Sequence, residues 1–190
     1  MTFESDKKTT LNKIDKSKKG SIDKEILGLV NKINKSKNYY TTSSCSGRIV
    51  LLSKKSGKKQ EAKWLFKSHK KITLEEIKSA LKPLPKTDVY FRFEPLILHI
   101  AAENIEYAQR LVNLARNLGF KRTGIQSTKN KIIIEIASTE ILETIIAKEG
   151  KLLVDSNYLK ILIQEANKKL QQNNKKIKKF ENNLKPVSSC

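Results

Sequence analysis

The sequence predicts an α+β fold in which helices pack against mixed or antiparallel sheets. Segments whose apolar residues alternate with polar ones stand beside segments whose apolar residues recur at helical spacing. Two strand–helix segments share one plan, because His69 and His99 each end a predicted strand a few residues before a helix. This echo predicts a pseudo-repeat of two related lobes. No G-x-G-x-x-G motif follows a strand, so a doubly wound, Rossmann-like fold is not expected.

In the N-terminal half, residues 1–20 predict a polar arm with at most a short helix. Ser21 is a suitable N-cap for a helix that ends near residue 35. Its apolar face consists of Ile22, Ile26, Leu29, Val30 and Ile33. Thr73 and Glu76 form a capping box that opens a second helix, which Pro83 ends. Strands are predicted at residues 48–52, 62–68, 88–93 and 96–101, and residues 53–59 form a loop between the first two.

In the C-terminal half, a helix over residues 104–118 ends at Gly119, a typical position for a glycine after a helix. Residues 120–126 and 131–137 predict two strands joined by a turn, and residues 152–154 predict a short one. Asp155 caps a long C-terminal helix that reaches about Asn182. We expect its basic end, from about residue 172 to 190, to project into solvent.

Length and composition indicate one globular α+β domain over residues 1–190. Hydrophobic residues make up 38% of the chain and charged residues 31%, which suits a globular protein with a heavily charged surface. No apolar run is long enough for a membrane span, and the N-terminus lacks the apolar region of a secretory signal. We therefore expect a cytoplasmic protein without a membrane partner.

The formal net charge of +20 indicates a polyanion partner, and RNA or DNA is the first choice. A lysine-rich proteome or a hot habitat would also give lysine-rich surfaces. Thermal adaptation usually adds glutamate with lysine, however, and here the acidic residues do not keep pace. The chain has two cysteines and two histidines, none in a C-x-x-C pair, so we expect no metal site and two free thiols.

The segment Tyr39–Arg48, YYTTSSCSGR, is unusual because eight of its ten side chains carry a hydroxyl or a thiol. Small side chains allow a ligand to approach the backbone, and Gly47 can adopt a positive φ. Backbone N–H groups, serine hydroxyls and the Arg48 guanidinium could together hold a carboxylate or a phosphate. The alternative is a plain turn before a strand, in which Cys45 is a small packing group.

Three further ionisable residues are candidates for chemistry. The histidines His69 and His99 could form a pair in one cleft, although a surface histidine and a buried core histidine are the simpler readings. Glu94 could balance a cationic ligand or pair with Arg92 or a lysine. Asp23 most simply serves the dipole of the first long helix.

Seven ordered blocks resemble the tRNA wybutosine-synthesizing protein 3 family, in its archaeal branch. They are DKSKKGSID (15–23), YYTTSSCSGRIVLL (39–52), FKSH (66–69), FRFEPLILHI (91–100), GFKRTGI (119–125), EIASTE (135–140) and a pattern over residues 151–170. The resemblance covers nearly the whole chain, and the serine–cysteine–serine–glycine–arginine core is its most specific element. The sequence departs at Thr123, where the family usually has serine, and at residues 143–146, which lack a frequent proline.

The resemblance implies a methyltransferase that uses S-adenosylmethionine and does not adopt the Rossmann-like fold. Its substrate would be N-4 of 7-aminocarboxypropyl-demethylwyosine, the base 3′ of the anticodon in phenylalanine tRNA, during wybutosine biosynthesis. The archaeal relatives also act on variant wyosine bases. The oligomeric state stays open.

The implied site combines three groups of residues. His69 and His99 are the candidate catalytic bases. The candidate cofactor-binding residues are Ser43, Ser44, Cys45, Ser46, Gly47, Arg48, Glu94, Ser138, Thr139 and Glu140. The candidate RNA- and base-binding residues are Tyr39, Tyr40, Trp64, Lys67, Lys70 and Arg122. The alternative functions are a non-catalytic basic RNA-binding module, in which the serine cluster is only a turn, and a DNA-compaction protein.

Overall fold

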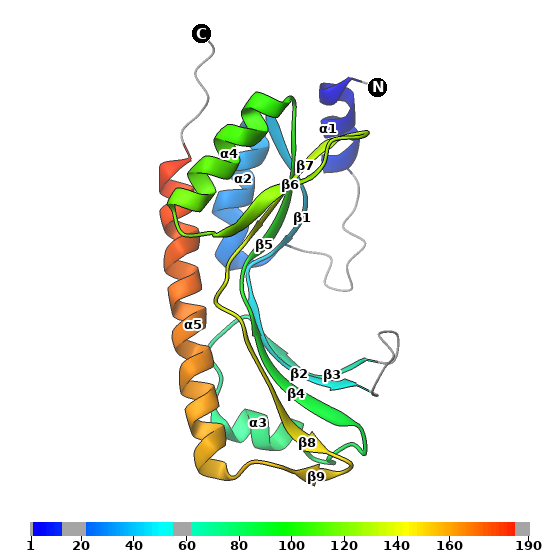
Figure 1. Ribbon diagram of the computed structural model, residues 1–190, viewed down its shortest axis with the longest axis vertical. Coiled ribbons are helices and arrows are strands. Elements are labelled where there is room, and N and C mark those ends of the chain that lie inside the picture. The colour runs from blue at the N-terminus through cyan, green and yellow to red at the C-terminus, as the bar shows by residue number, and fades with distance from the viewer. Residues whose placement is uncertain (1, 13–21, 55–61, 185–190) are drawn as a thin grey trace. The chain divides into compact units, whose positions relative to one another are not determined.

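The computed structural model describes residues 2–12, 22–54 and 62–184. Within these ranges the helices are α1 (Phe3–Leu11), the 3₁₀ turn η1 (Lys24–Ile26), α2 (Leu27–Lys35), α3 (Leu74–Ala80), α4 (Ile105–Asn117) and α5 (Ser156–Asn183). The strands are β1 (Tyr39–Cys45), β2 (Arg48–Lys54), β3 (Lys63–Ser68), β4 (Asp88–Glu94), β5 (Ile97–Ala102), β6 (Arg122–Ser127), β7 (Ile132–Ala137), β8 (Leu142–Lys148) and β9 (Lys151–Leu152). Figure 1 shows the order of these elements.

The described chain forms two units, and each combines one antiparallel sheet with helices. Unit 1 contains the described residues up to Ser46, Leu96–Thr139 and those from Asn174 onward. Unit 2 contains the described residues of Gly47–Pro95 and Glu140–Asn173. All strand pairs that the structure records are antiparallel. The α+β class expected from the sequence is thereby confirmed, and the expectation of one domain stays a prediction.

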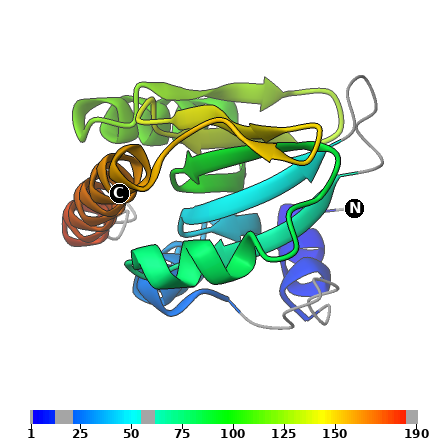
Figure 2. The ribbon, with the colours of Figure 1, turned by 90° about the horizontal axis from the view of Figure 1, so that it is seen from below.

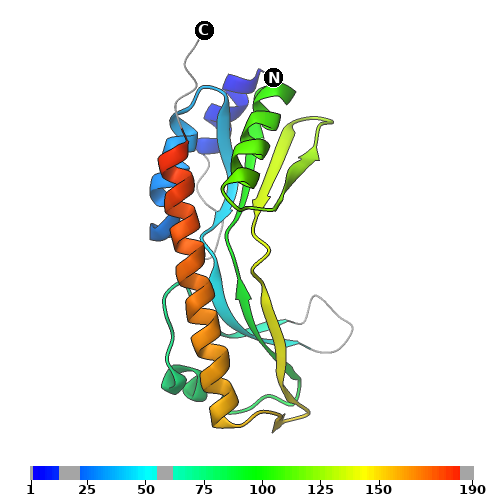
Figure 3. The same cartoon turned by 60° about the vertical axis from the view of Figure 1, so that its left-hand side comes forward.

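Unit 1 has a four-stranded sheet in the order β1-β5-β7-β6. Its core face packs against α2, α4 and the end of α5, and Figure 3 shows α4 beside the β6–β7 hairpin. Helix α1 contacts the other face, where the Phe3 ring lies 5.2 Å from the Tyr40 ring. The first part of the predicted N-terminal arm is therefore a short helix, α1, which packs on β1. Residues 13–21 of the arm lie outside the described residues.

Local sequence signals account for the clearest elements of unit 1. Asn104 caps α4 by accepting a hydrogen bond from the N–H of Tyr107 at 2.9 Å, and Gly119 ends this helix with φ of 99°. The buried face of α4 consists of Ala108, Leu111, Val112 and Ala115, as the helical spacing predicts. Both ends of α4 are thus confirmed.

Unit 2 has a five-stranded sheet in the order β3-β2-β4-β8-β9. Helix α3 and the first part of α5 pack against one face of this sheet (Figure 2). The capping box of Thr73 and Glu76 is present, and β4 buries Val89, Phe91 and Phe93 in strict alternation. The predicted capping box and the predicted strand are confirmed, and on the opposite face of the sheet the buried Val50 and Leu52 of β2 pair with Arg92 and Tyr90.

Two predicted elements differ from the structure, and one strand has no predicted counterpart. The hydroxyl-rich segment is not a bend, because Tyr39–Cys45 pairs with β5 as strand β1. The first long helix begins at Leu27 after a 3₁₀ turn, and Ser21, its expected N-cap, lies outside the described residues. Strand β8 was not predicted, since residues 142–148 mix polar and apolar side chains without a clear period. The two strand–helix segments of the predicted pseudo-repeat also occupy different positions in their sheets, because β3 is an edge strand and β5 is an interior strand.

The C-terminal helix end does not project into solvent over the residues described. Ile177, Phe180 and Leu184 are buried in the unit 1 core, and the Phe120 and Phe180 rings lie 5.6 Å apart. The prediction of a projecting basic end was wrong here because every third or fourth residue among the lysines is apolar. Nowhere in the described ranges does a helix combine the length and hydrophobicity that a membrane span needs.

The buried end of α5 yields a stability prediction. Phe180→Ala removes a fully buried ring and should lower the free energy of unfolding by about 3–5 kcal/mol. The exposed neighbour Lys179→Ala is the matched control and should stay within about 0.5 kcal/mol of the parent chain. Urea denaturation followed by circular dichroism measures both, and equal midpoints for the two variants would show that this helix end is not packed.

Candidate functional site

Ser43, His99 and Glu135 form a row across three neighbouring strands of unit 1. His99 is paired with Ser43 on β1 and with Glu135 on β7. Residues directly opposite in antiparallel strands point to the same face of the sheet, so the three side chains meet. The Ser43 Oγ lies 2.7 Å from the His99 Nδ1, and the His99 Nε2 lies 3.2 Å from the Glu135 Oε2.

A β-bulge at Thr42 creates this row. Thr41 pairs with Ile100 and Ser43 pairs with His99, so Thr42 is an extra residue in β1. Without the bulge, Thr42 would stand opposite His99 and Ser43 opposite Leu98, a buried core residue. The Thr42 hydroxyl instead donates to the His99 carbonyl at 3.2 Å. The bulge therefore turns the Ser43 hydroxyl toward the imidazole.

The polar partners determine which nitrogen of neutral His99 carries the proton. An ionised carboxylate can only accept, so the Nε2–H donates to Glu135. Nδ1 then has the lone pair and accepts from the Ser43 hydroxyl. The side chains of His99 and Glu135 are 33% and 21% exposed, so solutes can reach the row. The arrangement can accept a proton at Nδ1 and stabilise the resulting positive charge at Nε2.

Two small residues, Gly124 and Ala137, lie near the Glu135 end of this row on the same face of the sheet. Gly124 pairs with Glu135, and a Cβ at Gly124 would meet no atom within 4 Å. Ala137 pairs with both Ile97 and the exposed Arg122. The sheet surface beside the Glu135 carboxylate is therefore low, whereas the partly exposed Ile97 shares the face of His99 on β5.

Asp23 binds Ser46 and does not act as a helix cap. Its Oδ2 accepts from both the N–H and the hydroxyl of Ser46, each at 3.0 Å, and both residues are buried. No side-chain hydrogen bond caps the 3₁₀ turn that follows Asp23. A buried carboxylate needs hydrogen-bond donors and Ser46 supplies two, while the expected role of Asp23 at the helix dipole stays a prediction.

Gly47 has φ of 100°, the positive value expected from its place between two strands. Its carbonyl accepts a hydrogen bond from the Nδ1–H of His69 at 2.9 Å, since a carbonyl cannot donate. The Nε2 of neutral His69 therefore has the lone pair. His69 follows β3 by one residue, whereas His99 lies inside β5, so only His69 is at a strand end as predicted. Because they belong to different units, their sharing of one cleft stays a prediction.

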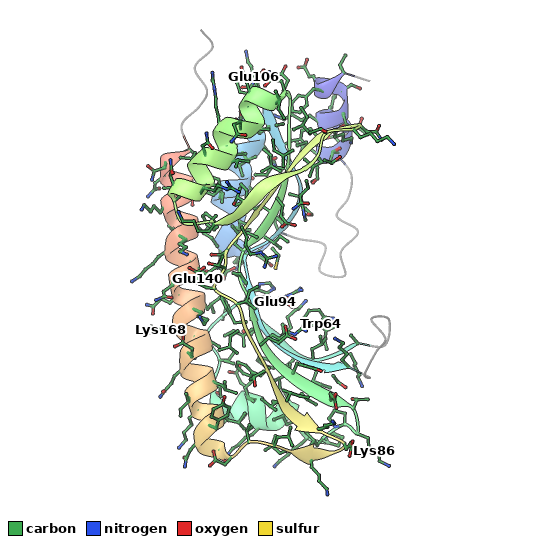
Figure 4. The ribbon with its side chains drawn as sticks, viewed as in Figure 1. Trp64, Lys86, Glu94, Glu106, Glu140 and Lys168 are labelled. Atoms are coloured by element: carbon green, nitrogen blue, oxygen red, sulfur yellow. The ribbon has the colours of Figure 1, made fainter. Side chains whose placement is uncertain are left out.

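Arginine, glutamate and tryptophan form a second polar array, in unit 2. The Arg48 Nε donates to the Glu94 Oε2 at 2.7 Å, and the Arg48 guanidinium lies 4.4 Å from the centre of the Trp64 ring. Arg92 lies between Glu94, at 3.8 Å, and Glu143, at 2.5 Å. Figure 4 labels Trp64 and Glu94 on their strands. Glu94 thus pairs with arginine, as the simpler interpretation of its role predicts.

Two of the predicted base-stacking residues are buried. Tyr39 belongs to the unit 1 core and donates to the Tyr107 carbonyl at 2.8 Å, and burial raises the pKa of its phenol to about 12. Tyr40 is fully buried and its hydroxyl donates to Asp6, while burial and this carboxylate raise its pKa. The two rings point to opposite faces of β1, and each is buried there, Tyr39 in the core and Tyr40 against α1. Neither ring can therefore stack on a base. Trp64, in contrast, is 45% exposed.

The other candidate residues occupy a range of surroundings. Ser44 and Cys45 are half-buried on β1, opposite Leu98 and Ile97. Lys67 and Lys70 are exposed, one on β3 and one just after it. Ser138 is buried, with its Oγ 3.5 Å from the Lys176 Nζ. Thr139 and Glu140 follow Ser138 between β7 and β8, and Thr139 is exposed.

Sequence reasoning missed Glu135 and Arg92 as site residues. Glu135 is the carboxylate on the non-core face of an isoleucine-rich strand, so the alternation of residues 131–137 was the available signal. Arg92 shares its face with Tyr90, whose ring centre lies 5.7 Å from the guanidinium. Its importance depends on a cross-strand partner, Glu143, in the strand that was not predicted.

The Asp23–Ser46 contact gives a second stability prediction. Ser46→Ala removes a hydroxyl donor from a buried carboxylate and should lower the free energy of unfolding by about 1–3 kcal/mol. Ser79→Ala, on the exposed side of α3, is the control and should not destabilise the chain, because alanine has the higher helix propensity. Thermal unfolding measures both, and an unchanged midpoint for Ser46→Ala would contradict the contact.

Known proteins resemble this chain over nearly its whole length. The model of the family described as methyltransferase TYW3 matches residues 5–186. A Pyrococcus furiosus relative named tRNA(Phe) 7-((3-amino-3-carboxypropyl)-4-demethylwyosine(37)-N(4))-methyltransferase 1 is 40% identical, with 96% of this chain and 94% of the relative covered. A Danio rerio relative named tRNA wybutosine-synthesizing protein 3 homolog is also 40% identical, with 94% and 73% covered.

Solved structures share the fold. The PH1069 protein of Pyrococcus horikoshii is similar with a TM-score of 0.92 at 37% identity, with 98% of this chain and 97% of that chain covered. A hypothetical protein from Aeropyrum pernix is similar with a TM-score of 0.75 at 26% identity, with 84% and 95% covered. Together, the family match and these identities show that the chain belongs to the methyltransferase TYW3 family, as its sequence blocks predict.

Proposed function

We propose that the protein is a tRNA methyltransferase that uses S-adenosylmethionine to methylate N-4 of a 4-demethylwyosine derivative in phenylalanine tRNA. The observation that carries the proposal is the match of residues 5–186 to the methyltransferase TYW3 family. Archaeal relatives at 36–40% identity are named for this reaction on 7-(3-amino-3-carboxypropyl)-4-demethylwyosine at position 37. We further propose that both units act as one catalytic domain on the base 3′ of the anticodon.

The chemistry needs a group that accepts the proton of N-4 while the nitrogen is methylated. His99 suits this task, because its lone pair at Nδ1 and its carboxylate partner at Nε2 favour uptake of a proton. His69 is the second candidate, with its lone pair at Nε2. Both histidines are retained as candidate bases.

The proposed cofactor-binding residues fit S-adenosylmethionine in part. When bound, this cofactor supplies a methyl group on a positively charged sulfur. Ser46 gives its N–H and hydroxyl to Asp23, so these two donors hold the chain and not the carboxylate of a ligand. Arg48 uses its Nε–H for Glu94, and a guanidinium has four further N–H donors for an anionic group.

The remaining candidates for holding the cofactor are Ser44, Cys45, Gly47, Ser138, Thr139 and Glu140. Gly47 adopts a positive φ of 100°, which suits glycine, and its carbonyl accepts from His69. The hydroxyl of Ser43, in contrast, faces His99.

We assign the RNA contact in unit 2 to the exposed ring of Trp64 and the lysines beside it. Base–aromatic stacking suits a single-stranded loop, and the net charge of +20 favours the phosphates. Lys54 and Arg92 both lie near the Tyr90 ring, at 5.5 and 5.7 Å, and extend the cationic surface along β2 and β4. Arg122, exposed on β6 of unit 1, remains a candidate phosphate contact.

Methyl transfer from radiolabelled S-adenosylmethionine tests the proposed reaction. Phenylalanine tRNA that carries the demethylated base should be labelled, and the same tRNA with unmodified guanosine should not be. Calorimetry should show saturable binding of S-adenosylmethionine. Tight tRNA binding without cofactor binding or label would contradict the enzyme and favour the non-catalytic RNA-binding module.

The role of Trp64 can be measured separately from catalysis. Trp64→Ala should weaken binding of an anticodon stem-loop by about 1–3 kcal/mol, and Trp64→Phe should retain most of the affinity, because an aromatic face remains. Tyr158→Ala, on the exposed surface of α5, is the matched control and should bind like the parent chain. Trp64 is the only tryptophan, so RNA should also quench the intrinsic fluorescence. Equal affinities for Trp64→Ala and Tyr158→Ala would exclude stacking on Trp64.

A further inference from the structure

We propose that Ser43, His99 and Glu135 form a proton relay in which the Ser43 hydroxyl, and not the imidazole, touches the substrate nitrogen. The inference rests on the proposed methyl transfer and assigns two residues roles that the family match does not give. Ser43 becomes the group that accepts the substrate proton, and Glu135 becomes a positioning residue that acts through His99.

The order of the row determines which group can meet the substrate. The Glu135 carboxylate occupies the Nε2 side of the imidazole, at 3.2 Å, and the Ser43 hydroxyl occupies the Nδ1 side, at 2.7 Å. Both ring nitrogens are therefore within hydrogen-bond distance of a protein partner. The exposed Ser43 hydroxyl stands on β1, an edge strand, and is the member of the row that a ligand can reach without displacing a partner of His99.

The bulge at Thr42 supports a functional role for the contact between Ser43 and His99. It places Ser43 and Tyr40 on the same face of β1, which strict alternation of the strand would not allow. β-Bulges commonly re-aim a side chain beside an active site. Ser43 is exposed on an edge strand of the sheet, so an aromatic base can approach its hydroxyl.

The relay conserves atoms and charge. The bond from N-4 to the methyl carbon forms as the carbon–sulfur bond of S-adenosylmethionine breaks. The proton of N-4 passes to the Ser43 Oγ, and the original hydroxyl proton passes to the His99 Nδ1. The imidazolium that results keeps its Nε2–H bonded to Glu135, whose charge compensates it. Release of the proton from His99 to water restores the row.

A nucleophilic role for Ser43 is excluded on chemical grounds. Transfer of the methyl group to the hydroxyl would give a serine methyl ether, which does not pass its methyl group on to a ring nitrogen under mild conditions. The serine–histidine–glutamate row therefore serves proton transfer, and the methyl group moves directly between the two substrates.

Kinetics of single variants test the relay. Ser43→Ala should lower kcat by roughly 10²-fold, the lower range for general acid–base catalysis, with unchanged KM for tRNA and S-adenosylmethionine. Ser43→Thr keeps the hydroxyl and suits a strand, so it should restore most of kcat. Glu135→Gln keeps the shape but loses the charge and should also lower kcat alone. Glu106→Gln, in the first turn of α4 (Figure 4), is the control and should behave like the parent chain.

A spectroscopic measurement tests the row without any substrate. The chain has two histidines, so nitrogen NMR of the imidazoles gives two sets of signals, which His69→Asn assigns. Above about pH 8, where an ordinary imidazole is neutral, His99 should carry its proton at Nε2. A proton at Nδ1 would overturn the relay, because the lone pair would then face Glu135.

The two proposals fail in different ways. A parent chain that transfers no methyl group to demethylated tRNA would contradict the proposed function and remove the substrate of the relay. An active parent chain whose Ser43→Ala and Glu135→Gln variants keep full kcat would overturn the relay alone. Loss of kcat in Ser43→Thr as large as in Ser43→Ala would also overturn it, because the hydroxyl would then not matter.

Discussion

The register between β1 and β5 determines what the hydroxyl-rich segment can do. Seven consecutive residues, Tyr39–Cys45, are held as an edge strand, and one bulge inside them decides which hydroxyl faces His99. A shift of one residue would point the Ser43 side chain into a core of leucine and isoleucine. The pairing of β5 with β7 adds Glu135 on the other side of the imidazole. The row is thus a consequence of sheet geometry, which holds it more rigidly than a loop would.

A second constraint is the buried carboxylate of Asp23 in unit 1. It binds the backbone and hydroxyl of Ser46, the residue directly before the positive-φ Gly47. This contact holds the chain just after β1, so Ser46, one of the serines expected to bind an anion, stabilises the protein instead. In unit 2, the pairing of Arg48 with Glu94 and its contact with Trp64 similarly combine charge with an exposed ring.

Local signals predicted much of the fold, and cross-strand contacts account for what they missed. The cap of α4 at Asn104 and the alternation of β4 depend on neighbouring residues, so they could be read from the sequence. Tyr39 and Tyr40 looked available for stacking, because nothing nearby in the sequence indicates that Tyr107 and Asp6 bind their hydroxyls. Glu135 lies 36 residues from His99, so its role required the register of the sheet. The end of α5 was misjudged because its lysines hid a helical apolar stripe.

A crystal structure with S-adenosylhomocysteine and an anticodon stem-loop carrying the demethylated base would locate the substrate nitrogen relative to Ser43, His99 and Glu135. We expect N-4 to lie about 3 Å from the Ser43 Oγ, with His99 still between Ser43 and Glu135. A base bound elsewhere on the chain, or with N-4 turned away from this row, would contradict the assignment of the proton path.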